Sequence, residues 1–130
     1  MDPPDTSSIV ARRILIVEDD FFIATTLAET FAAAGAIVLG PVSSVTEARS
    51  IADHETVDLG VLDVSLTGET SFGIATILLD QEIPFLFMSG HDLDVLPVAL
   101  RAVPMLQKPV ARNRILRLTC DLLDHRVPQT

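Results

Sequence analysis

The chain of 130 residues has few features that could bind it to a membrane or to nucleic acid, or that could form a disulfide framework. Its one cysteine, Cys120, can form no disulfide within the chain and offers no zinc-binding spacing. Nine Lys or Arg stand against eighteen Asp or Glu, and a net charge of −9 argues against non-specific binding to nucleic acid or anionic lipid. The sequence therefore predicts an acidic protein that contacts neither nucleic acid nor membrane.

No apolar run approaches the ~20 residues of a membrane span, and the N-terminus lacks the order of charged and apolar residues typical of a secretory signal. We therefore expect a cytoplasmic location. The length suits one domain with its own core. Residues 1–11 contain two prolines and few apolar side chains, which predicts a flexible N-terminal arm. The domain itself is expected over residues 12–126, with a short tail at 127–130 and no further domain.

Short apolar runs recur along the chain and end at turn or charged residues. They predict five strands, at 13–17, 36–39, 59–62, 84–88 and 104–107. Runs of this kind are typical of strands buried on both faces of a parallel sheet. Segments with helical spacing lie between them, at 21–34, 44–54, 71–79 and 113–123, and a further helix is expected to begin near Leu96. The alternation predicts an α/β fold with helices on both faces of the sheet.

Polar residues follow four of the five predicted strands. The acidic triplet 18–20 follows the first strand, Asp63 the third, Ser89 the fourth and Lys108 the fifth. Ligands bind outside the carboxyl ends of the strands in open α/β sheets, so these side chains are expected to converge. Converging carboxylates repel one another unless a cation lies among them, and hard oxygen ligands suit Mg²⁺. A carboxylate nucleophile, a divalent cation, a lysine and a hydroxyl are the groups needed to transfer a phosphoryl group to an aspartate.

In sequence letters, the four strand ends read VEDD, LD, MSG and QKP. In this order the motifs resemble the receiver domains of two-component response regulators, over residues 13 to about 124. The resemblance implies a flavodoxin-like (βα)5 fold, a doubly wound parallel sheet of strand order 2-1-3-4-5. It also implies a signalling phosphoacceptor that promotes only its own phosphorylation and dephosphorylation, rather than an enzyme.

By the same resemblance, Asp63 is the phosphoacceptor and one of the ligands of Mg²⁺. Asp19 binds the metal directly, Glu18 binds it through a water, and Ser65 offers its backbone carbonyl. Asp20 lies one position beyond the acidic pair of the family and ranks third. A phosphohydrolase with an aspartyl intermediate would need a second acid where Ser65 stands, which argues against that class.

Ser89 and Lys108 match the hydroxyl and the lysine that contact the phosphoryl group, and the bond between Lys108 and Pro109 is commonly cis in the family. Ser89 is also assigned to the switch. The aromatic residue usual at the second switch position is replaced by Met105, so a change of aromatic rotamer cannot report phosphorylation here. Thr67 stands where the family usually has a proline, and it is followed by the expected Gly68.

The segment around strand four and the absence of an appended domain are similar to the stand-alone alphaproteobacterial receivers called FAT GUY. Those proteins have Phe-Ala-Thr-Gly where this chain has Phe-Met-Ser-Gly at residues 87–90. The resemblance implies a histidine kinase, including the HWE or HisKA2 type, or a phosphotransfer protein as the phosphoryl donor. It also implies a downstream protein target and a monomer or weak homodimer.

Each motif alone has a simpler interpretation: an acidic triplet can cap a helix, Ser-Gly can form a turn, and one lysine can be a surface residue. Two functions remain open. The chain is either a phosphorylation-dependent module that relays, drains or reports a phosphoryl group, or a receiver-fold interaction module that signals without phosphorylation. The complete set of Glu18, Asp19, Asp63, Ser89 and Lys108 favours the first.

Overall fold

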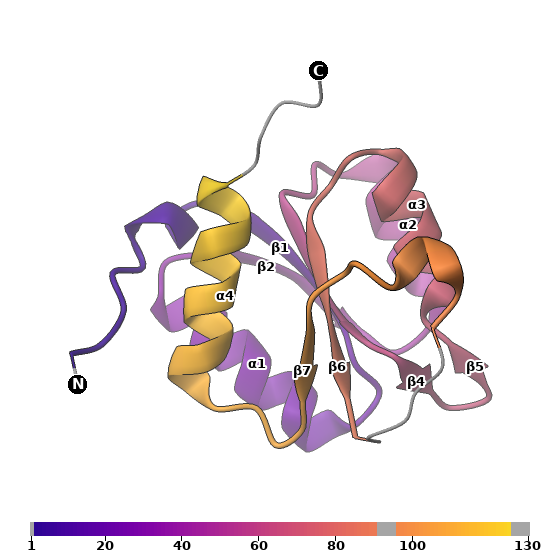
Figure 1. Cartoon of the computed structure of the whole chain (residues 1–130), viewed down its shortest axis with the longest axis horizontal. Helices are drawn as coiled ribbons and strands as arrows, with labels where there is room; N and C mark the ends of the chain where they lie inside the picture. Colours follow the sequence, from indigo (N-terminus) through magenta and orange to yellow (C-terminus); the bar gives the residue numbers. More distant parts are fainter. Residues whose placement is uncertain (1, 91–95, 126–130) are drawn as a thin grey trace.

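The computed structural model describes residues 2–90 and 96–125, and Figure 1 shows a parallel sheet between two layers of helices. Its five strands are β1 (Arg13–Val17), β2 (Ile37–Val42), β3 (Leu59–Asp63), β6 (Phe85–Ser89) and β7 (Met105–Gln107). They pair in the order β2-β1-β3-β6-β7, and every pair is parallel. This is the order 2-1-3-4-5 of the flavodoxin-like fold, as the sequence predicted.

The described residues form four α-helices, and helices cover both faces of the sheet (Figure 1). They are α1 (Phe21–Ala33), α2 (Val45–His54), α3 (Phe72–Asp80) and α4 (Arg112–Asp124). The core accordingly has two parts: Phe31 and Ile115 lie in the part beneath α1 and α4, whereas Ala48 and Ile74 lie in the part beneath α2 and α3. Across the described part of the chain, no helix combines the length and the apolar character that crossing a membrane requires.

The three inner strands, β1, β3 and β6, are almost wholly apolar. Polar residues of the site lie at or directly after the last residue of each strand. Every residue of β3 and β6 is buried, and so is β1 after its first residue. Gly60 is closely packed in β3: a Cβ atom there would lie 2.7 Å from Cδ1 of Leu78 and 3.2 Å from Cβ of Phe85, so these side chains would have to move. This packing fixes the carboxyl ends of the strands at one edge of the sheet.

The helix expected to begin near Leu96 is not formed, and this prediction is wrong. Over residues 96–104, which the structure describes, the chain forms only a 3₁₀ turn, η2 (Val98–Leu100). Pro97 precedes the turn and Pro104 follows it closely. Because the residue before a proline avoids the α conformation, the segment between the two prolines has little room for further helical turns. His91, the residue that follows the MSG motif, lies outside the described residues.

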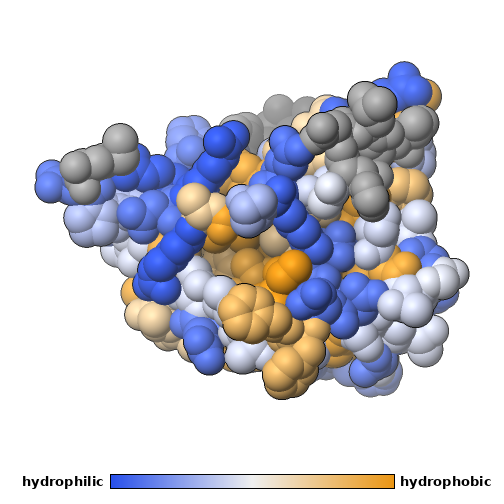
Figure 2. Space-filling model, turned by 90° about the horizontal axis from the view of Figure 1, so that it is seen from below, coloured by the Kyte–Doolittle hydropathy of each residue, from blue (hydrophilic) through white to orange (hydrophobic). Residues whose placement is uncertain are grey.

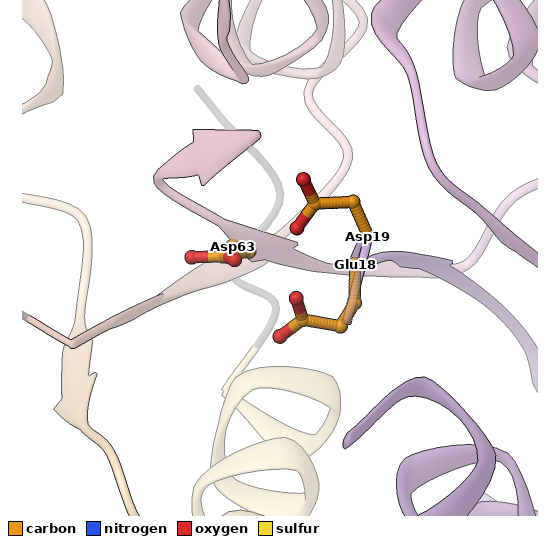
Figure 3. A group of neighbouring side chains, drawn as sticks. All are labelled: Glu18, Asp19 and Asp63. Atoms are coloured by element: carbon orange, nitrogen blue, oxygen red, sulfur yellow. The ribbon is translucent and has the colours of Figure 1, made fainter. Parts of the chain in front are cut away.

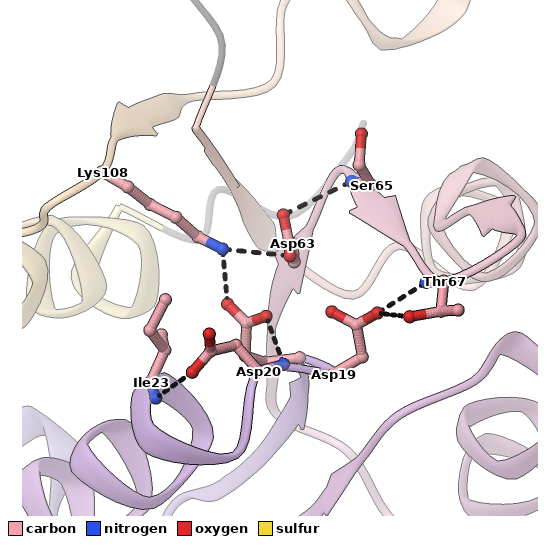
Figure 4. Close-up of polar contacts among 8 residues, drawn as sticks. Asp19, Asp20, Ile23, Asp63, Ser65, Thr67 and Lys108 are labelled. Carbon is pink, nitrogen blue, oxygen red and sulfur yellow. Dashed lines mark hydrogen bonds and ion pairs between the residues drawn. The ribbon is translucent and has the colours of Figure 1, made fainter.

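The loop after β3 forms a hairpin that the apolar pattern did not reveal. Its strands, β4 (Ser65–Leu66) and β5 (Glu69–Thr70), have two residues each, and two residues, Thr67 and Gly68, connect them. Gly68 has a φ angle of 78°, a left-handed conformation that favours glycine. The hairpin carries Thr67 at its tip, beside the end of β1 (Figure 4).

The segment predicted to be a flexible arm, 1–11, packs against the domain in its second half. Residues Ser7–Ile9 form a 3₁₀ turn, η1, and Ile9 is completely buried. The hydroxyl of Ser8 donates a hydrogen bond to Asp124, and the guanidinium of Arg117 donates one to the carbonyl of Asp2. The N-terminal segment thus lies along α4, because Ile9 supplies an apolar anchor that its polar neighbours concealed.

Candidate functional site

Three carboxylates meet at the carboxyl edge of the sheet (Figure 3). Glu18 and Asp19 directly follow β1, and Asp63 is the last residue of β3. Parallel pairing aligns Val17 of β1 with Leu62 of β3, so the residues that follow emerge side by side. One oxygen from each carboxylate lies within 4.8 Å of the others. Glu18 and Asp63 are buried, whereas Asp19 is partly exposed.

Lys108, the single lysine of the chain, reaches this cluster from the end of β7 (Figure 4). Its Nζ lies 2.7 Å from Oε1 of Glu18 and 3.0 Å from Oδ2 of Asp63. Its backbone N–H donates a hydrogen bond of 2.8 Å to the carbonyl of Ser89, which joins the ends of β6 and β7. The peptide bond between Lys108 and Pro109 is cis, as the sequence predicted, and so is the bond between Gly40 and Pro41.

Burial and the ion pair act in opposite directions on the pKa values of Glu18 and Lys108. Burial raises the pKa of Glu18 to about 7, the hydrogen bond from Lys108 opposes this rise, and the neighbouring Asp63 adds to it. For Lys108, burial alone would lower the pKa, but its hydrogen bonds to Glu18 and Asp63 outweigh burial and raise it. Lys108 is therefore a cation at neutral pH, and Glu18 ionises at a higher pH than an ordinary glutamate when no metal is bound.

Asp19 has a different environment from Glu18. Its Oδ2 accepts hydrogen bonds from both the backbone N–H and the hydroxyl of Thr67, at the tip of the hairpin (Figure 4). The hydroxyl of Thr67 is the main cause of a lowered pKa at Asp19, and the slight burial of the carboxyl works against it. Asp19 is therefore ionised well below neutral pH, so it presents a permanent negative charge at the mouth of the site.

Asp20 points away from the cluster and caps a helix instead. Its Oδ1 accepts a hydrogen bond of 3.0 Å from the backbone N–H of Ile23, in the first turn of α1. Its own N–H donates to Oε2 of Glu18 at 3.1 Å, which helps to hold the glutamate in place. The acidic triplet therefore combines both interpretations that the sequence allowed: two residues face the site, and the third is an N-cap.

Three further residues predicted to belong to the site lie at strand termini around it. Ser65 begins β4, and its N–H donates a hydrogen bond of 3.3 Å to Oδ1 of Asp63. Ser89 is the last residue of β6 and is buried. Met105 begins β7, where it aligns with Phe87 of β6 and packs against the core part beneath α2 and α3. The structure thus brings Ser65 and Ser89 to the carboxyl edge of the sheet, whereas Met105 lies at the opposite end of the short strand β7.

The donor set fits a divalent cation. Glu18, Asp19 and Asp63 offer only carboxylate oxygens, and Mg²⁺ prefers hard oxygen ligands at about 2.1 Å in an octahedral arrangement. Opposite oxygens in such an arrangement lie about 4.2 Å apart, close to the 4.8 Å limit within which the three oxygens already lie. A cation would also relieve the repulsion among carboxylates that Lys108 only partly neutralises.

Sequence reasoning missed the role of Thr67. Thr67 was noted only as a departure in the loop, yet it supplies both donors that bind Asp19. No local pattern could have shown this, because the two residues are separated by 48 positions in the chain. The hairpin that joins them consists of strands too short to produce a periodic signal.

Comparisons with known proteins identify a family and several similar solved structures. The family model described as "Response regulator receiver domain" matches residues 14–119. The solution structure of SdrG from Sphingomonas melonis Fr1 is similar, with 30% sequence identity and a TM-score of 0.75 over 88% of this chain and 98% of that chain. No match was found among curated protein sequences.

Two other solved structures share the fold. The receiver domain of the response regulator PhyR from Erythrobacter litoralis is 20% identical, with a TM-score of 0.83 over 95% of this chain and 98% of that chain. The non-phosphorylated receiver domain of HemR from Leptospira biflexa is 25% identical, with a TM-score of 0.78 over 92% of this chain and 99% of that chain. In each case the similarity spans nearly the whole of both chains.

Proposed function

The chain belongs to the response regulator receiver domain family, and we propose that it accepts a phosphoryl group from a histidine kinase or phosphotransfer protein on Asp63. The observation that carries this proposal is the position of Lys108, whose Nζ lies 3.0 Å from the carboxylate of Asp63 beside the acidic pair. A carboxylate held between a cation and a candidate metal site has the groups that phosphoryl transfer requires.

In the reaction, a carboxylate oxygen of Asp63 attacks the phosphorus of a phosphohistidine. The new bond joins oxygen to phosphorus, the bond from phosphorus to the histidine nitrogen breaks, and that nitrogen keeps the electron pair and takes a proton. Lys108 already contacts Oδ2 of Asp63, so its positive charge is in place to stabilise the charge on the transferred group. The N–H of Ser65 orients the other oxygen, Oδ1.

We propose that Glu18, Asp19 and Asp63 hold Mg²⁺, with the backbone carbonyl of Ser65 as a further ligand. When bound, the ion would supply positive charge against the oxygens of the phosphoryl group. The residues of the chain do the remaining work: Asp19 is kept ionised by Thr67, and Glu18 is kept near the site by Lys108 and the N–H of Asp20. The carboxylate chemistry of these residues supports the assignment.

We propose that Ser89 binds the phosphoryl group and that this contact starts the change of shape. Ser89 is buried at the end of β6, and its carbonyl is bonded to the backbone of Lys108. A movement of Ser89 would therefore pull on β7, where Met105 stands in place of an aromatic switch residue. The coupling would pass along the backbone rather than through the rotation of an aromatic ring.

We propose that the phosphoryl donor docks on the apolar start of α1, with a histidine kinase of the HWE or HisKA2 type as the expected donor. The side chains of Phe21 and Phe22 are 85% and 77% exposed, directly after the acidic residues of the site. Figure 2 shows apolar side chains gathered beside hydrophilic ones on the face seen from below, where the strands end in Figure 1. Exposed apolar patches of this kind are typical of protein interaction sites.

The test is intact-mass measurement after incubation with acetyl phosphate, with Mg²⁺ or with EDTA. We expect one phosphoryl adduct on the wild-type chain with Mg²⁺, and none with EDTA or in Asp63→Asn. The control is Asp53→Asn, which removes an equal charge from the exposed face of α2 and should be phosphorylated normally. An adduct that persists in Asp63→Asn would mean a different acceptor.

A second outcome would favour a different function. If neither acetyl phosphate nor an autophosphorylated histidine kinase gives an adduct on the folded wild-type chain, the phosphoacceptor proposal is wrong. The receiver-fold interaction module that signals without phosphorylation would then be the better description. Circular dichroism of the same samples would show that the fold is intact.

A further inference from the structure

We propose that Thr67 is a positioning residue for the metal site, where it holds one oxygen of Asp19 so that the other is presented to the cation. This inference rests on the proposed function, because it concerns the same site. Thr67 would not bind the cation itself. It would act through Asp19, the most exposed of the three carboxylates.

The hydrogen bonds of Thr67 go to one of the two carboxylate oxygens of Asp19 and leave the other for a different partner. Both the backbone N–H and the hydroxyl of Thr67 donate to the same atom, Oδ2. Figure 4 shows the second carboxylate oxygen of Asp19 turned away from Thr67, toward the side where Asp63 lies. Two donors on one oxygen restrict the rotation of the carboxylate more than a single donor would, and they leave the other oxygen available as an acceptor.

Thr67 can do this because the hairpin that carries it is itself held at both ends. Leu66, directly before Thr67, is buried in the core. Glu69, on the other side of the turn, accepts a hydrogen bond of 3.1 Å from the backbone N–H of Val45 at the start of α2. Gly68 allows the tight turn between them with its φ angle of 78°. The donors of Thr67 are therefore fixed relative to the sheet.

A ligand that is oriented before the metal binds loses less conformational freedom on binding. Hydrogen-bond partners of metal ligands typically change metal affinity by about 10- to 100-fold when they are removed. Here only one of two donors can be removed without altering the backbone, so we expect a smaller change. Proline, the residue usual at this position in the family that the sequence resembles, could supply neither donor, since it lacks both the N–H and a hydroxyl.

The test is the dissociation constant for Mg²⁺, measured by isothermal titration calorimetry with no phosphoryl donor present. Thr67→Val removes the hydroxyl and keeps the shape and the N–H, and we expect roughly 3- to 10-fold weaker binding. Thr67→Ser restores the hydroxyl and should bind within about twofold of wild type. Thr76→Val is the matched control, because the Thr76 hydroxyl donates to the backbone carbonyl of Phe72 on the exposed side of α3.

Unfolding by urea with and without Mg²⁺ separates positioning from a structural role. If Thr67 only supports the fold, Thr67→Val will lower the unfolding midpoint equally with and without the metal, and the proposal is overturned. Equal Mg²⁺ affinity in Thr67→Val and wild type would also overturn it, while leaving the proposed function intact. Failure of the wild-type chain to bind Mg²⁺ would instead reject the metal site, and the role of Thr67 with it.

Discussion

The ammonium of Lys108 lies 2.7 Å from Oε1 of Glu18, a carboxylate whose side chain is completely buried. The same ammonium contacts Asp63 on the neighbouring strand. The site is thus held together by one cation between two acids, which come from the ends of two different strands. Removing one partner of a buried pair leaves the other charge without compensation, and this costs more than the pair contributes.

Lys108→Met should destabilise the protein in the absence of metal by roughly 1–3 kcal/mol at pH 8, because it leaves Glu18 and Asp63 without their cation. The loss should be smaller at pH 5.5, where Glu18 is largely protonated. Urea unfolding followed by circular dichroism measures both values. Arg49→Met, on the exposed face of α2, is the control for losing a positive charge. An equal loss at both pH values would contradict the role of Glu18.

The raised pKa of Glu18 predicts a specific dependence of stability on pH. Between pH 4.5 and about 7 the folded state holds a proton on Glu18 that the unfolded state has released. The free energy of unfolding from this group therefore falls as the pH rises through that window, and it is constant above it. Relative to Glu18→Gln, the wild-type chain should lose on the order of 1–2 kcal/mol between pH 5 and 8 in EDTA.

The measurement is urea unfolding of the two proteins at half-unit steps of pH. A stability difference that stays flat across the window would show that Glu18 is ionised throughout. A difference that changes in the opposite direction would show that the ion pair with Lys108 dominates over burial. Either result would revise the electrostatic description of the site, although the positions of the residues would stand.

Substituting the exposed phenylalanines should separate the chemistry from the docking of the donor. Phe21→Ser with Phe22→Ser should leave the rate of phosphorylation by acetyl phosphate unchanged, because a phenyl ring offers no group that could bind the metal or the phosphoryl group. Transfer from an autophosphorylated histidine kinase should slow by about tenfold or more, as expected for loss of exposed aromatic anchors. Stability should change by less than about 0.5 kcal/mol.

The control for that pair is Val98→Ser, since Val98 is 75% exposed but lies on η2. The Val98→Ser variant should accept a phosphoryl group from the same kinase at the wild-type rate. Slower reaction with acetyl phosphate in the phenylalanine variant would mean that the substitutions disturb the acidic site itself. Unchanged transfer from the kinase would mean that the donor uses another surface.

Gly60→Ala should destabilise the protein by about 1–3 kcal/mol, because overpacking a closely filled core forces its neighbours to move. The added Cβ would meet Leu78 at 2.7 Å and Phe85 at 3.2 Å. Gly73→Ala is the matched control, since its Cβ would meet only Val45, at 3.4 Å, and alanine suits a helix better than glycine. The midpoint of thermal unfolding should fall in Gly60→Ala and rise in Gly73→Ala. A lower midpoint in both variants would show that this layer of the core is sensitive to any added methyl group.

The sheet and the acidic cluster could be predicted from the sequence because both depend on local features. Each inner strand is a continuous apolar run that ends at a charged or polar residue, and parallel pairing places those ends together. Glu18, Asp19, Asp63 and Lys108 accordingly lie where their positions after the strands indicated.

What could not be predicted depends on contacts distant in sequence or on competing local signals. The hydrogen bonds between Thr67 and Asp19 require both the hairpin of β4 and β5 and the pairing of β1 with β3, which brings the hairpin beside the end of β1. The segment after Leu96 has apolar residues at helical spacing, but the prolines at its two ends allow only a 3₁₀ turn. Ile9 is a single apolar residue among polar ones, so no periodicity marks it as part of the core.

The burial of Ile9 beside the last helix also bears on how the chain is made. A ribosome delivers η1 first and α4 last, yet the two pack together in the finished domain. While the chain is growing, α1 supplies the only helix on this face, and the part of the face that α4 covers has no apolar layer above it. This face of the domain can therefore close only after residues 112–124 have left the exit tunnel, and until then its uncovered sheet is the surface that a chaperone would bind.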